Sequence, residues 1–301
     1  MPFGSADLTE VGIVAEATFG VTPAGAVASV PHTGISMSPT LEQVNSNTLT
    51  AFRIRQAVRL GFRGGQGELP FELRYGDYDP FMEMVMGKAW TADQLVTGGA
   101  ILSKTLEMKT PAINLYEQYV GVVASTFALS INADSTDPIT GSFGLIAQDF
   151  NAAAAPLSAN YTAPTQNEPM TAGDCQVTLD GVTNQTFVSV ALNLTNTIVT
   201  PRTIGRNTVR EFVLGKQEVS GTIVFYVEDD SWLDRAKNEV VAAVAAQCLD
   251  PAGNEILFEL PKIKVVGIST DRSGGPIRCT GQITAFDPAQ LVNLRMTRTP
   301  V

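Results

Sequence analysis

The chain has 301 residues, 44% of them hydrophobic, with 30 Asp and Glu against 20 Lys and Arg, a formal charge of -10. This length and apolar content predict one large or two modest globular cores. The acidic balance disfavours tight binding of DNA or RNA, because nucleic-acid binders concentrate positive charge. The sequence begins with no basic leader and has no run of about 18 uninterrupted apolar residues. We therefore expect a soluble protein that is not inserted in a membrane.

Alternating apolar and polar residues recur in short runs bounded by Gly, Pro, Asn and Asp, a pattern typical of β-strands. The sequence therefore predicts a mainly β protein. The predicted strands, in chain order, are residues 34–38, 68–74, 102–109, 119–131, 141–148, 176–179, 188–195, 219–227, 256–260, 263–269 and 278–286.

Only two segments have helical patterns. In the first, Asp79 is predicted to cap a helix that begins at Pro80 and continues through Met86, with Gly87 as its stop. In the second, Asp230 is predicted to cap a helix whose apolar face is formed by Trp232, Leu233, Ala236, Val240 and Val244.

Each helix follows a strand that ends in an aromatic and acidic turn and precedes a similar set of strands, which indicates an internal duplication. We predict two tandem domains, residues 1–160 and 161–301. Residues 151–173 between them are rich in Ala, Pro, Thr and Asn and lack apolar periodicity. This composition is typical of a linker on the surface.

Each half also contains a long polar arm whose charge is opposite in sign to that of the whole protein. We interpret the arms as docking elements for the acidic surface of another subunit, because long loops inside compact domains are usually functional or disordered. The alternative is a pair of solvated loops with unpaired surface arginines. The predicted contact residues are Arg53, Arg55, Arg59 and Arg63 in the first arm and Arg202, Arg206, Arg210 and Lys216 in the second.

The residues that could support catalysis or bind a metal are few. Cys175, Cys248 and Cys279 form no CxxC pair, and His32 is the sole histidine. The acidic clusters at 77–79 and 228–230 could be calcium ligands or catalytic carboxylates, but their place before the helices favours capping. We therefore predict no catalytic, cofactor-binding or metal-binding residues, and no enzyme.

Five segments carry a resemblance to a known family. They are VGIVAEATFGVTPAGAVASVPHTGISMSP, GELPFELRYGDYDPFMEMVMGKAW, ITGSFGLIAQDF, VSGTIVFYVEDDSWLDRAKNE and LDPAGNEILFELPKIKV. In this order they resemble the two-domain tail tube proteins, or major tail proteins, of long-tailed siphophages. The likeness covers nearly the whole chain, although no single motif is diagnostic.

The resemblance implies that each half is a β-sandwich with one flanking helix and a long arm loop, whose inner sheet joins those of its neighbours in a barrel around a channel. Since rings of this family contain six such domains, it implies a homotrimeric, pseudo-hexameric ring; the alternative is six chains. With about 24 strands spaced about 4.8 Å apart, the lumen would be roughly 35 to 40 Å wide. A negatively lined wall would let duplex DNA pass without being bound.

The implied partners are further copies of the chain, a tape-measure protein, and tail-tip and tail-terminator proteins. The implied location is the virion tail, with assembly in the host cytoplasm. Two alternatives remain open at this point. One is another β-rich assembly protein, such as a secretion-type tube or a capsid decoration protein, and the other is an enzyme or sugar-binding β-sandwich.

Overall fold

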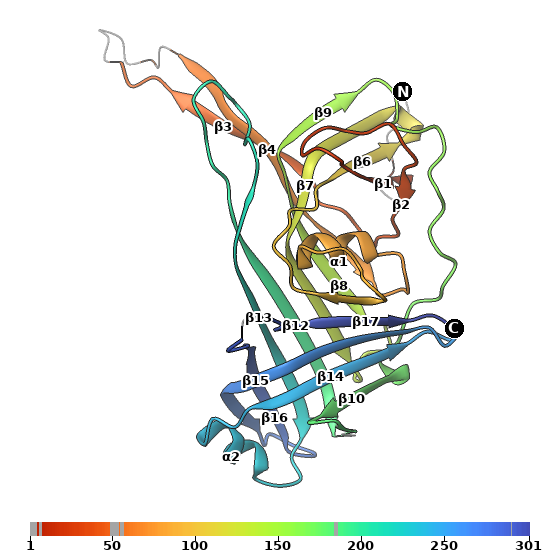
Figure 1. Cartoon of the computed structure of the whole chain (residues 1–301), viewed down its shortest axis with the longest axis vertical. Coiled ribbons are helices and arrows are strands. Elements are labelled where there is room, and N and C mark those ends of the chain that lie inside the picture. The colour runs from red at the N-terminus through yellow and green to blue at the C-terminus, as the bar shows by residue number, and fades with distance from the viewer. Residues whose placement is uncertain (1–4, 6–7, 49–53, 55–56, 184–185, 290) are drawn as a thin grey trace.

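The computed structural model describes every residue except 1–4, 6–7, 49–53, 55–56, 184–185 and 290 (Figure 1). The elements of the first half are β1 (Glu10–Ala15), β2 (Ala28–Ser29), β3 (Ser38–Asn45), β4 (Val58–Glu72), α1 (Asp79–Met86), β5 (Gln94–Val96), β6 (Lys104–Thr110), η2 (Pro111–Ile113), β7 (Leu115–Asn132), β8 (Thr140–Ala147) and β9 (Asp149–Ala153). Those of the second half are η3 (Ala172–Asp174), β10 (Cys175–Leu179), β11 (Val182–Thr183), β12 (Phe187–Val199), β13 (Val213–Tyr226), α2 (Ser231–Lys237), β14 (Ala242–Leu249), β15 (Glu255–Asp271), β16 (Arg278–Ala285) and β17 (Arg295–Thr299). The prediction of a mainly β protein is confirmed.

One antiparallel sheet runs through both halves in the order β3-β4-β8-β7-β12-β13-β16-β15. In Figure 1 the strands β7, β8, β12 and β13 run along the long axis of the molecule. The first four strands of the order belong to the first half and the last four to the second. We call this eight-stranded sheet the inner sheet, and its β7–β12 pairing joins the two halves.

The two halves repeat the same set of strand pairings. β7 and β15 are long strands whose first parts pair with a second layer, formed by β6 and β9 around β7 and by β14 and β17 around β15. β1 then pairs with β6 as β10 pairs with β14. The halves therefore share one topology.

Three β-bulges also recur at equivalent places, which fixes how the halves align. Because a bulge adds an unpaired residue and changes the register of a strand, its position is a specific marker. The equivalent register shifts are Leu41/Gln43 and Asn196/Ile198, Lys104/Leu106 and Ala242/Val244, and Ala124/Thr126 and Val265/Gly267.

The core is continuous between the halves, as expected of a sheet that spans both. Phe71, Phe143 and Phe127 stack in the first half, with ring centroids 4.9 Å and 5.3 Å apart along that series. Phe258 of β15 extends the stack, 6.2 Å from Phe127. β5 of the first half also pairs with β17 of the second. The division at residues 160 and 161 therefore describes a repeat in topology and stays a prediction as a domain boundary.

The first helix differs from its prediction at its N-terminus. Tyr78 is the N-cap residue, without a side-chain capping bond, and Asp79 is the first helical residue. The Asp79 carboxylate instead accepts a hydrogen bond from Arg298 of β17, so the capping role predicted for Asp79 is wrong. The stop at Gly87 is confirmed, since Gly87 has φ 66° and its N–H donates to the Glu83 carbonyl.

The second helix is shorter than predicted. It ends at Lys237, and Ala242–Leu249 forms β14, so Val240 and Val244 lie outside the helix. Alternate residues of β14, including Val244 and Cys248, are buried, which is the period of a strand. Asp230 is the N-cap residue but makes no side-chain capping bond; the adjacent Asp229 carboxylate accepts the Ser231 N–H at 3.0 Å.

The predicted linker packs against the first half along much of its length. Thr162 exchanges backbone hydrogen bonds with Val27 and Ser29, and Met170 is fully buried and bonded to Leu73 and Ile139. Apart from Met170 the segment is exposed or half-buried, so it lies on the surface while its backbone is bonded to the first half, and its role as an inter-domain linker stays a prediction. The low hydropathy of residues 151–173 gives no sign of these contacts with the first half, because most of them are made by backbone groups and single side chains.

Candidate assembly surfaces

The arms extend the inner sheet beyond the body of the protein. β3 and β4 pair outward as far as Asn45 and Val58, and the loop between β12 and β13 lies alongside them (Figure 1). The prediction of arm loops therefore needs correction, because much of the first arm is a β-hairpin. Its apolar residues are exposed, including Val44 at 55%, Val58 at 51% and Leu60 at 68%.

The two arms contact each other within one chain. The Arg63 N–H donates to the Asn207 carbonyl at 2.8 Å. Arg202 hydrogen bonds to Glu42 through two guanidinium nitrogens, one at 2.8 Å, and this contact raises the pKa of Arg202. The guanidinium also lies over the Phe62 ring, 4.5 Å from its centroid.

The predicted docking residues divide into three groups. Arg53 and Arg55 lie outside the described residues. Within the chain, Arg63 pairs with Asp149 at 2.8 Å, Arg202 with Glu42, and Lys216 with Glu218 at 2.9 Å. The exposed residues without an acidic partner within 4 Å in the described part of the chain are Arg59, Arg206 and Arg210.

Sequence reasoning did not find Glu42, Phe62 or Gln148 as members of this surface. The Gln148 side-chain amide donates to the Val209 carbonyl at 2.8 Å and so holds the second arm against the body. No local pattern marks these residues, since each contact joins positions about 60 or more residues apart. Only the pairing of the two hairpins brings them together.

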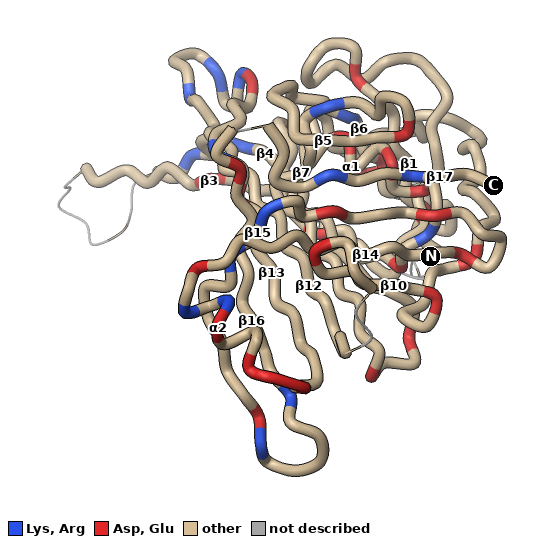
Figure 2. Tube along the Cα trace, turned by 60° about the horizontal axis from the view of Figure 1, so that its bottom comes forward, with Lys and Arg blue, Asp and Glu red and all other residues tan. Residues whose placement is uncertain are grey.

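One face of the inner sheet packs on the core and the other is open and polar. Charges are sparse there, because β8 and β12 contain no charged residue, and β12 is tan in Figure 2. The open face is rich in hydroxyl and amide groups, including Ser130, Asn132, Ser142, Ser189, Asn193, Thr195, Ser220, Thr222, Gln282 and Thr284.

The basic residues on the open face are paired with acids. Arg74 lies 3.6 Å from Glu72, and Lys216 is bonded to Glu218. Lys264, opposite Thr284, lies 2.6 Å from Glu239, and Arg278 lies 2.6 Å from Asp134. Hydrogen bonding to Asp134 raises the pKa of Arg278. The face therefore presents little free positive charge to a polyanion.

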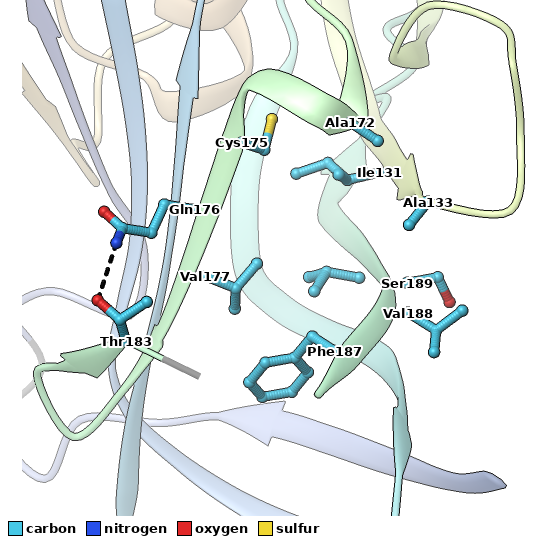
Figure 3. Close-up of a pocket in the computed structure, with 11 residues that line it drawn as sticks. Ile131, Ala133, Ala172, Cys175, Gln176, Val177, Thr183, Phe187, Val188 and Ser189 are labelled. Atoms are coloured by element: carbon cyan, nitrogen blue, oxygen red, sulfur yellow. Dashed lines mark hydrogen bonds between the residues drawn. The ribbon is translucent and has the colours of Figure 1, made fainter. Parts of the chain in front are cut away.

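A hollow in the second half, next to the end of β7, offers little for catalysis. It has a volume of about 340 Å³ between β10, β12 and the end of β7, where Ile131, Val177 and Phe187 contribute apolar walls (Figure 3). Its polar contact is the 2.8 Å hydrogen bond from Gln176 to Thr183. Among the described residues that line it, none carries a charged side chain.

Among the described residues, no group of three or more His, Cys, Asp or Glu is arranged to hold a metal ion. Within the same part of the chain, no helix has the length and hydropathy needed to cross a membrane.

These features define a mainly β protein that presents an extended arm and a polar sheet face. The family model of the phage tail tube protein matches residues 7–287, and the chain belongs to that family. It is a structural subunit of the tail tube in the virion tail, and self-assembly into a tube follows from the family. A search of curated proteins finds no significant match.

Proposed function

We propose that three copies of this chain form one ring of a siphophage tail tube, and that stacked rings enclose a channel through which DNA enters the host. The observation that carries this proposal is the repeat of a four-stranded unit within one continuous sheet. Each chain then supplies two of six units. Rings close by rotation, whereas contacts between rings stay open and extend the tube.

The open face of the inner sheet would line the channel. It has no clear charge excess, because the acids Glu68, Glu72, Glu218 and Asp271 are equalled in number by the four paired bases Arg74, Lys216, Lys264 and Arg278. The strongly negative lining expected from composition is therefore not concentrated on this face. A wall of hydroxyl and amide groups without free cations would still let DNA pass. Few of the counterions condensed on the DNA would be released on contact, so the wall would gain little affinity for the phosphates.

The arms would contact neighbouring copies through their free cations and exposed apolar residues. Arg59, Arg206 and Arg210 are the described candidates for pairing with acids of another subunit. Arg63 and Arg202 would act earlier, by holding the two arms in one shape. We further propose that the tube assembles in the host cytoplasm around a tape-measure protein, from a tail-tip complex at one end to a terminator at the other.

Negative-stain electron microscopy of the purified subunit at increasing concentration tests this function. Hollow tubes or rings are the expected result. Particles that stay monomeric or dimeric at every concentration, even when purified tail tips are added as nuclei, would contradict it. DNA binding by the tubes at physiological salt would contradict the proposed passage without retention.

A further inference from the structure

The junction between the two halves offers a template for the junction between two copies. β12 pairs with the second part of β7 in the register Asn193↔Ala128. The Ala133 N–H donates to the Val188 carbonyl at 2.9 Å. Since bonded and non-bonded pairs alternate along an antiparallel ladder, Asn193↔Ala128 is a non-bonded pair whose side chains lie close together.

The inner sheet has an open edge at each end. β14 pairs with β15 as far as Ile263, and beyond it β15 pairs with β16 on one side only, within the described chain. At the other end, residues 38–40 of β3 pair with β4 on one side and with no other strand of the described chain. Val266, beside the open edge of β15, is 63% exposed.

Both edges carry features that hinder unregulated pairing. The Ser36 N–H points inward to the Glu68 carbonyl at 3.0 Å, so by alternation the backbone of Pro39 faces outward. Pro39 has no N–H, so the open edge of β3 lacks one hydrogen-bond donor. A bulge at Val265/Gly267 twists the open edge of β15. These are the devices by which proteins protect an edge that must pair with one partner only.

We propose that the open edge of β15 pairs with residues 36–40 of the next copy, in the register that β7 and β12 use within one chain. Aligning the equivalent bulges places Ser38 opposite Ser269, as Asn193 lies opposite Ala128. Thr40 then faces Gly267 of the other copy. Pro39 takes a bonded position opposite Ile268, so the ladder forms with one hydrogen bond fewer.

The burial of the two helices supports the same pairing. β7 and β5 of the first half pack against α1, and the second half covers the rest of it. The Asn196 amide donates to the Val85 carbonyl at 2.7 Å, and five residues of α1 are buried. In α2 only Trp232 is buried, and Leu233 is 52% exposed. The next copy would cover α2 as the second half covers α1.

Exposed apolar residues beside α2 would be covered by the same contact. Val240 is 41% exposed and Val241 47%, close in sequence to the end of α2. Burying such side chains supplies the hydrophobic driving force that a strand edge alone lacks. The occupant we infer is a second copy of this chain, because its first half has the shape that the template requires.

This inference rests on the proposed function and is tested by cysteine crosslinking of assembled protein. The variant S38C/S269C, on a C175S background, is assembled, oxidised and run on a non-reducing gel. We expect a ladder of covalent oligomers that ends at three chains. The matched control T40C/S269C, shifted by two residues, should crosslink at least tenfold less, and A128C/N193C should crosslink within a single chain.

Mixing keeps the test valid if the double variant assembles poorly. A 1:1 mixture of S38C and S269C subunits should yield covalent dimers, whereas either variant alone should yield none. Tubes that form without this crosslink, or with an equal yield for T40C/S269C, would overturn the register while leaving the tube function intact. Failure of the unmodified protein to assemble at all would count against both.

Discussion

Arg202 of the second arm and Glu42 of the first are joined by two hydrogen bonds, although they lie 160 residues apart in the sequence. The pair is about half exposed, so its effect on global stability is small. The pair joins the two arms, so that they present one surface.

Reversing one charge of this pair should therefore impair assembly and not folding. We expect R202E and E42R each to slow tube growth, measured by light scattering, with unchanged melting temperatures. The double variant E42R/R202E restores the pair in reverse and should recover growth. If the double variant assembles as poorly as the single ones, the two residues act through contacts with other subunits and not with each other.

Glu107 fixes the segment between the two halves. Its carboxylate is fully buried and accepts hydrogen bonds from the Gln118 amide at 2.8 Å, the Leu157 N–H at 3.0 Å and the Tyr161 hydroxyl. Burial and then this contact with Glu107 raise the pKa of Tyr161, which stays protonated and donates.

Removal of the Tyr161 hydroxyl leaves a buried carboxylate with one donor fewer. We expect Y161F to lower the free energy of unfolding by about 1.5 to 3 kcal/mol, since the acceptor is charged. The matched control is Y116F, because the Tyr116 hydroxyl makes one long contact of 3.4 Å to Asn114. Equal urea midpoints for the two variants would contradict the role given to Glu107.

Asp79 should make stability depend on pH. Burial raises the pKa of Asp79 to about 6, against the opposing effect of Arg298. The folded protein therefore holds this proton more tightly than the unfolded chain, whose Asp pKa is about 3.9. Stability from this group is full below about pH 4 and is lost as pH rises through about 6.

The variant D79N isolates this effect. Between pH 4 and pH 7 the wild type should lose up to about 3 kcal/mol relative to D79N in urea unfolding. A constant difference over this range would exclude the pKa shift. If the free energy of unfolding of the wild type instead rises relative to that of D79N as the pH rises, the contact with Arg298 outweighs the effect of burial on Asp79.

Cys175 and Cys248 are directly opposed on β10 and β14. The Asp180 N–H donates to the Ala243 carbonyl at 2.8 Å, so by alternation the cysteines form a non-bonded pair with close side chains. Such a pair meets the spacing that a disulfide requires. Both are free thiols in this structure.

Oxidised glutathione should therefore convert these two thiols into one disulfide, releasing two molecules of reduced glutathione. The reaction should be slow, because hydrogen bonding to Cys175 and burial raise the pKa of Cys248. We expect reactive thiols in the denatured protein to fall from three to one, and C248S to form no internal disulfide. Crosslinked dimers of the wild type as the main product would contradict this geometry.

The sequence was sufficient to predict the strands whose apolar residues alternate with polar ones. The end of α1 was predictable as well, because Gly87 is a local signal with a local cause. β14 was not, since the run from Val240 to Leu249 is apolar enough to suit a helix or a strand. Tertiary pairing with β10 and β15 decides between them.

The arms show a similar limit. Their basic residues are visible in the sequence, but the partners of Arg63 and Arg202 are set by the packing of two hairpins. The prediction that Asp79 caps α1 was wrong for the same reason, because Arg298 of the last strand contacts the Asp79 carboxylate. Local chemistry predicted helix capping, and a distant cation competed successfully for the carboxylate.

The number of chains in each ring decides whether one chain supplies two units of the channel wall. Cryo-electron microscopy of assembled tubes, with the mass per unit length measured on the same sample, gives this number. We expect three chains per ring and six pseudo-equivalent units around the channel. Six chains per ring would contradict it, because each chain would then contribute only one of its two units to the channel wall.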